Sequence, residues 1–170
     1  MIAGARIVLN VRLDAARDGL VGLAGASWMM SLPRRRAAHN GHPAGRGRPG
    51  LSADGGTRLV AVTFGSVTTP AADQIILPFR WEPVEPGDEL IVQLSGSIIL
   101  ARAVARGHSA LTLAGICQIP PGALAPDDVE QVRLELMDAS REFITTVARD
   151  VNRAAGSGPE PGPVGPAWAW

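Results

Sequence analysis

The chain has 170 residues, with 16 basic and 16 acidic side chains, so its formal net charge is zero. This length fits about one domain that can bury a sizeable core. Balanced charge creates no overall field that would attract nucleic acid or an anionic membrane, so we do not expect nucleic acid as a partner.

The single cysteine and the N-terminal sequence indicate the cellular setting. Cys117 has no second cysteine for an internal disulfide, which fits a reducing compartment. Charged residues from Arg6 to Asp18 interrupt any apolar core of a secretory signal. The apolar run over residues 20–30 is shorter than the roughly 20 residues that a bilayer-spanning helix needs. We therefore expect a soluble, cytoplasmic protein with no integral membrane segment.

The first elements are a strand and a helix. Apolar and polar side chains alternate over residues 5–14, which predicts a half-buried strand. Asp14 is then a suitable N-cap for a helix from about Ala15 to Met30, with Trp28 at its end. Glycines inside this helix weaken it and allow close packing: Gly19, Gly22 and Gly25.

Residues 33–56 change character, since they are rich in Gly, Pro and Arg and show no periodicity. They predict a long mobile loop that could include a short strand. His39 and His42 have an H-x-x-H spacing there, but further ligands and a helix to hold them are lacking, so we expect no metal site. A basic loop that contacts phosphate or RNA is a weaker alternative, because no aromatic residues are interleaved with the arginines.

Four further segments alternate as strands do and are joined by short connections, which predicts an antiparallel meander. They span residues 58–67, 74–84, 89–104 and 109–119. In the second, Phe79 and Trp81 share one face, while Arg80 and Glu82 lie on the other and are expected in solvent.

The clearest helix follows, from Asp127 to about Arg153. Asp127 and Glu130 have the spacing of a capping box, and an apolar stripe at helical spacing includes Phe143 and Val147. We expect a single α+β domain over residues 1–154, with a disordered Gly/Pro-rich tail over 155–170.

Two long runs carry a family resemblance. ILPFRWEPVEPGDELIVQLSGSIIL and HSALTLAGICQIPPG, followed by the long terminal helix, resemble actinobacterial members of the START/Bet v 1-like (SRPBCC) superfamily. The opening ARIVLNVRLDAARDGLVGLAGASWMMS is similar to the first strand and helix of that group. The resemblance implies a helix-grip fold, in which a curved antiparallel sheet wraps around the C-terminal helix and encloses an apolar cavity. Members bind lipids, sterols, plant hormones or polyketides, and some are aromatase/cyclases.

Ligand sites of this kind are mostly apolar with few polar groups. The residues that we expect to contact a ligand are Trp28, Phe79, Trp81, Leu94, Arg102, Leu111, Leu113, Phe143 and Val147. Packing in a solid core is the competing explanation for each of the apolar residues, and Arg102 could instead lie past the rim of the sheet. We identify no catalytic residue, cofactor or metal ligand in the sequence.

The leading hypothesis is binding or carriage of a small hydrophobic, lipid- or polyketide-like ligand. One alternative is a polyketide aromatase/cyclase-like enzyme, in which Arg80 or Arg102 stabilises an enolate. The other is an interaction module that uses the basic loop or the C-terminal tail. The sequence does not determine the ligand or the oligomeric state.

Overall fold

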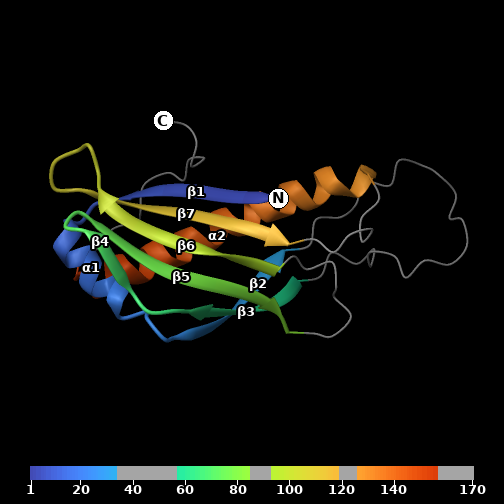
Figure 1. The fold of residues 1–170 in the computed structure, drawn as a ribbon, viewed down its shortest axis with the longest axis horizontal. Coiled ribbons are helices and arrows are strands. Elements are labelled where there is room, and N and C mark those ends of the chain that lie inside the picture. The colour runs from blue at the N-terminus through green and yellow to red at the C-terminus, as the bar shows by residue number, and fades with distance from the viewer. Residues whose placement is uncertain (34–56, 85–92, 119–125, 157–170) are drawn as a thin grey trace, which may run out of the picture.

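The computed structural model describes residues 1–33, 57–84, 93–118 and 126–156 (Figure 1). Two helices and seven strands are found in these residues. In chain order they are β1 Ile2–Leu9, α1 Leu13–Val21, β2 Ser27–Pro33, β3 Thr57–Phe64, β4 Thr68–Ala71, β5 Gln74–Pro83, β6 Gln93–Arg102, β7 Ser109–Gln118 and α2 Pro126–Ala154. The predicted loop with its two histidines and nearly all of the predicted terminal tail lie outside the described residues.

The strands form one antiparallel sheet in the order β1-β7-β6-β5-β3-β2, and β4 pairs with β5 beside this path. Figure 1 shows α2 running along one face of the sheet, with α1 at the end opposite the N-terminus. Buried side chains alternate with more accessible ones along the strand, as in β1, because only one face packs against α2. The predicted α+β helix-grip fold, a curved antiparallel sheet around a long C-terminal helix, is confirmed.

One apolar core lies in the layer between the sheet and α2. The strands other than β4, whose residues are all exposed, supply alternate residues to it. α2 supplies a stripe at intervals of three and four residues. The fully buried members with the largest side chains include Ile7, Leu20, Leu77, Trp81, Leu94, Ile98, Leu100, Leu111, Leu113 and Phe143. Burial of one such side chain contributes about 1.5–3 kcal/mol to stability.

The first helix is shorter than predicted, and a strand takes its second half. α1 ends at Val21, Gly25 has a positive φ of 73°, and residues 27–33 form β2 instead of continuing the helix. Weak helix propensity at the glycines explains the early end. Trp28 therefore lies on a strand, opposite Val62 of β3.

The predicted first strand, residues 5–14, begins and ends too late, since β1 spans Ile2–Leu9. β1 ends at Leu9 and Leu13 already begins α1, so Arg12 occupies the N-cap position that we predicted for Asp14. Asp14 lies in the first turn, where a carboxylate interacts favourably with the helix dipole. Its Oδ1 is also 3.4 Å from Arg12 Nε.

The later elements differ from the prediction by only a few residues. β3 ends at Phe64, and the short strand β4 that follows was not predicted. α2 begins at Pro126, so Asp127 lies in its first turn and does not precede it. The outward direction of Arg80 and Glu82 is confirmed, since both are substantially exposed and their side chains form a 2.8 Å ion pair.

The two helices cross where α1 has a glycine. A Cβ atom added at Gly19 would lie 2.9 Å from the carbonyl oxygen of Val151, so a larger residue would push α1 away from α2. This contact fixes the C-terminal half of α2 beside α1. The N-terminal half of α2 extends toward the opposite end of the sheet, near residue 1 (Figure 1).

Candidate ligand site beneath helix α2

The candidate site lies on the inner face of the sheet at β5. Trp81 is opposite Leu94 on β6 and Val62 on β3, in the centre of the strand order. Its side chain is 1% exposed, and Phe79, two residues earlier on the same face, is also buried. The alternation of the strand directs both rings toward α2, as the sequence predicted.

Phe143 of α2 connects these rings into an aromatic cluster. Its ring centroid is 5.0 Å from that of Phe79 and 5.2 Å from that of Trp81, the latter in an edge-to-face arrangement. The ring of Phe64 on β3 is stacked on that of Phe143, with 6.1 Å between the centroids. Aromatic pairs in this range contribute about 0.5–1.5 kcal/mol each beyond the area that they bury. Phe143, with no exposed surface, is thus the central residue of the site.

Trp28 closes the cluster on the β2 side. Its ring centroid is 4.8 Å from that of Phe64 in an edge-to-face contact, and 6.4 Å from that of Phe143. Trp28 is half-buried and stands on an edge strand, next to the exposed Met29. It therefore lies at the boundary between the aromatic cluster and solvent.

The other apolar candidates are all buried in the same core, at different distances along it. Leu94 is level with Trp81, whereas Leu113 and Leu111 lie opposite Ile98 and Leu100, progressively nearer to α1. Val147 lies one turn beyond Phe143 in the same direction. Of the predicted set, Phe79, Trp81, Leu94 and Phe143 form the immediate site, with Trp28 at its edge.

Two buried polar atoms border this site. Within the described part of the chain, neither Trp81 Nε1 nor Ser140 Oγ has a hydrogen-bond partner. Ser140 is fully buried on α2, one turn before Phe143. Ser140 falls within the helix that the sequence predicts, but no sequence pattern pointed to its hydroxyl. Phe64 was also recognised only as a strand residue.

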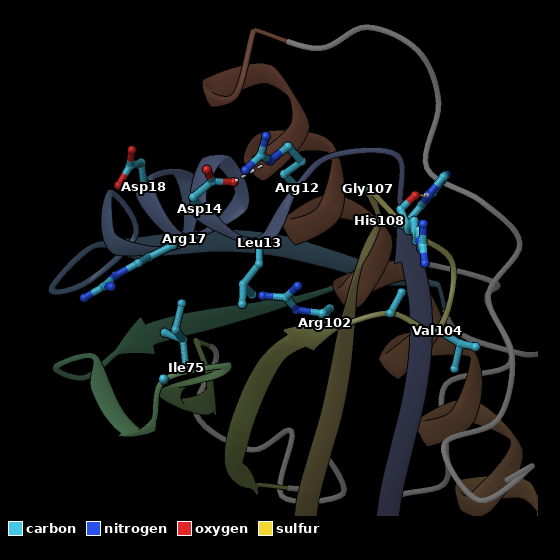
Figure 2. Close-up of a pocket in the computed structure, with 13 residues that line it drawn as sticks. Arg12, Leu13, Asp14, Arg17, Asp18, Ile75, Arg102, Val104, Gly107 and His108 are labelled. Carbon is cyan, nitrogen blue, oxygen red and sulfur yellow. Dashed lines mark hydrogen bonds and ion pairs between the residues drawn. The ribbon is translucent and has the colours of Figure 1, made fainter.

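Arg102 lies elsewhere. It is exposed at the end of β6, eight residues or about 27 Å along the strand from Leu94. There it lines a groove of about 840 Å³ with Leu13, Arg17, Ile75 and other residues of α1 and the β6–β7 turn (Figure 2). Alternation predicted an inward direction for Arg102, but the core ends before it. Neither Arg102 nor the outward-facing Arg80 is therefore available to a ligand beside Trp81.

Cys117 lies in the same row of the sheet as Trp81 and Leu94. It is 3% exposed and exchanges two backbone hydrogen bonds with Met1. Burial raises the pKa of the Cys117 thiol above its ordinary value of 9.0, although the nearby N-terminal ammonium opposes this shift.

We expect the Cys117 thiol to react with a disulfide reagent such as DTNB about 100-fold or more slowly in the native protein than in urea at pH 8. The thiolate is the reactive form, and access to it requires an opening that costs several kcal/mol. Because burial raises the pKa of the folded Cys117 thiol above 9.0, the contribution of this thiol to stability is fully present below about pH 9. It is lost as the pH rises through the folded-state pKa. Rapid labelling at pH 8 without urea would contradict the burial of this side chain.

In residues 1–33, 57–84, 93–118 and 126–156, no three His, Cys, Asp or Glu side chains gather as metal ligands would. Neither helix of these segments combines the length and apolar character that crossing a bilayer requires.

No family model and no curated protein matches the sequence. Several solved structures are similar to it in outline. Ara h 8.0201 is 15% identical with a TM-score of 0.44, and the match covers 93% of this chain and 99% of that one. A conserved protein from Geobacillus kaustophilus is 10% identical with a TM-score of 0.43, over 91% and 97% of the two chains. A major latex protein family member from Arabidopsis thaliana is 10% identical with a TM-score of 0.41, over 86% and 94%. Because these TM-scores are below 0.5, the fold assignment rests on the strand order and pairing described above.

Proposed function

We propose that this protein binds or carries a small hydrophobic ligand in the space between the sheet and α2, next to Trp81. We further propose that it is a cytoplasmic member of the START/Bet v 1-like superfamily, which the helix-grip arrangement and the single buried cysteine support.

The observation that carries the proposal is the indole N–H of Trp81. It is buried among apolar side chains and has no partner in the described residues. Buried donors in native proteins are nearly always paired, and an unpaired one costs about 1–3 kcal/mol. A bound ligand that places a hydrogen-bond acceptor beside the ring would remove that cost, whereas apolar side chains alone cannot.

Substitution of Ser140 by leucine distinguishes a hollow space from a filled one. In a hollow space the added apolar side chain is accommodated, so the free energy of unfolding is unchanged or higher. At the same time the ligand space is blocked. In a filled core the same change costs about 1–3 kcal/mol through overpacking. Urea denaturation of Ser140→Leu measures which of these occurs.

Ligand occupancy is measured in parallel by native mass spectrometry of the protein as expressed, and by titration with a library of lipophilic compounds. We expect bound ligand in the unmodified protein and none in Ser140→Leu. Glu142→Leu is the matched control, because Glu142 is exposed on the same helix and its replacement leaves the interior unchanged. Absence of any ligand, together with a destabilised Ser140→Leu variant, would mean that the core is solid and the proposal wrong.

A further inference from the structure

The hydroxyl of Ser140 is unusual for a helical position. Serine and threonine inside helices commonly donate to the carbonyl oxygen four residues earlier. Thr145 and Thr146 of α2 do so, to Arg141 and Glu142 at 2.7 and 3.0 Å. Ser140 does not, and no other group of the described chain accepts its proton. Its hydroxyl is therefore available on the buried face of α2.

The indole N–H of Trp81, on the sheet that faces α2, is a second buried donor without a partner in the described residues. The ring of Phe143 is 5.2 Å from that of Trp81, and Ser140 precedes Phe143 by three residues, about 4.5 Å along the helix axis. Trp81 of the sheet and Ser140 of the helix thus both neighbour Phe143 in the apolar layer between β5 and α2. A carbonyl oxygen has two lone pairs, so a single one can accept a hydrogen bond from each of two such donors.

The buried side chains around this site determine whether a charged or a neutral molecule can bind there. The buried polar residues of the described chain are Ser109, Ser140 and Asn152, none of which is charged. Moving an ionised carboxylate or phosphate into such a place costs much more than two neutral hydrogen bonds return. A neutral carbonyl oxygen needs only those two donors.

We propose that the site beneath α2 is specific for neutral carbonyl compounds, such as ketones and esters, whose oxygen accepts hydrogen bonds from Trp81 Nε1 and Ser140 Oγ. This inference rests on the proposed function and adds the chemical class of its ligand. Phe79, Leu94 and Phe143 then contact the apolar part of the molecule.

The test uses two probes of nearly equal shape, 2-acetylnaphthalene and 2-ethylnaphthalene, which differ by a carbonyl in place of a methylene group. Their dissociation constants are measured for the full chain and for Trp81→Phe and Ser140→Ala. The ratio of the two constants is compared between variants, because the difference in hydrophobicity of the two probes is the same in each variant and cancels. We expect each substitution to lower the preference for the ketone by about tenfold, the amount that one lost hydrogen bond corresponds to. Glu142→Ala, on the exposed face of α2, should leave the ratio unchanged.

Ser140→Ala keeps the test decisive if Trp81→Phe does not fold. An independent measurement is the NMR resonance of the Trp81 indole proton, which should move downfield with the ketone and not with the hydrocarbon. If both probes bind but the ratio is the same in all variants, the donors are bonded to internal water and the carbonyl assignment is wrong, while the proposed function stands. If neither probe binds to the full chain, the carbonyl assignment is wrong. The proposed function is wrong as well only if the lipophilic library also yields no ligand and Ser140→Leu is destabilised.

Discussion

Replacement of Phe143 by alanine is expected to lower the free energy of unfolding by about 3–5 kcal/mol, as large-to-small changes of buried aromatic residues do. Phe143 has no exposed surface, and its ring contacts those of Trp28, Phe64, Phe79 and Trp81. Its loss removes contacts to β2, β3 and β5 together. Since domains of this size are stable by about 5–15 kcal/mol, the variant should unfold at much lower urea concentration.

Two variants separate packing at Phe143 from general effects on the helix. Phe143→Leu keeps most of the volume and should cost clearly less than the alanine change. Glu142→Ala removes an exposed neighbour and should change stability by no more than about 0.5 kcal/mol. A cost below about 1 kcal/mol for Phe143→Ala would contradict the aromatic cluster, because the ring would then lack the neighbours described here.

Most of the sheet could be predicted because one face of each strand is apolar and the other polar. β5 and β7 match the predicted segments closely for this reason, and the same rule correctly placed Trp81 inward and Arg80 outward. The long amphipathic stripe made α2 equally clear.

Prediction failed between α1 and β2, where the local pattern is ambiguous. Trp28 and Met30 lie inward and Met29 outward, but this alternation covers few residues and follows a glycine-rich segment that is equally compatible with a weak helix. The pairing of β2 with β3 decides in favour of a strand, and such long-range pairing is not visible in the local sequence.

The candidate site was predictable as a set of inward residues, but not as a cluster. Which of them meet depends on strand register and on the position of α2, and these bring Phe64 to Phe143 across many residues of sequence. For Arg102, alternation gave a direction without showing that the core ends before the end of β6. The unpaired state of Ser140 depends on every neighbouring atom, so no sequence pattern reveals it.

Replacement of Gly96 by alanine should have the second large effect, about 3 kcal/mol or more of lost stability. Gly96 of β6 lies opposite Gly115 of β7 on the inner face, two residues along the strand from Leu94. A Cβ atom at Gly96 would collide with the carbonyl oxygen of Ala114 and come within 2.6 Å of the Cα atom of Gly115. These are backbone atoms held in the sheet, so they can move only if the β6–β7 pairing is distorted. Urea denaturation and amide hydrogen exchange across β6 and β7 measure both consequences.

Gly115→Ala is the matched control, since it adds the same methyl group to the partner residue of the pair. Its Cβ would approach the Cδ1 atom of Leu94 at 2.9 Å, and this is the end of a flexible side chain that can change rotamer. We therefore expect Gly115→Ala to cost less than half as much as Gly96→Ala and to leave hydrogen exchange in β6 and β7 nearly unchanged. Equal costs for the two variants would show that the β6–β7 backbones yield as easily as a leucine side chain. The sheet beside Trp81 would then be too easily deformed to hold the two proposed hydrogen-bond donors at fixed positions for a ligand.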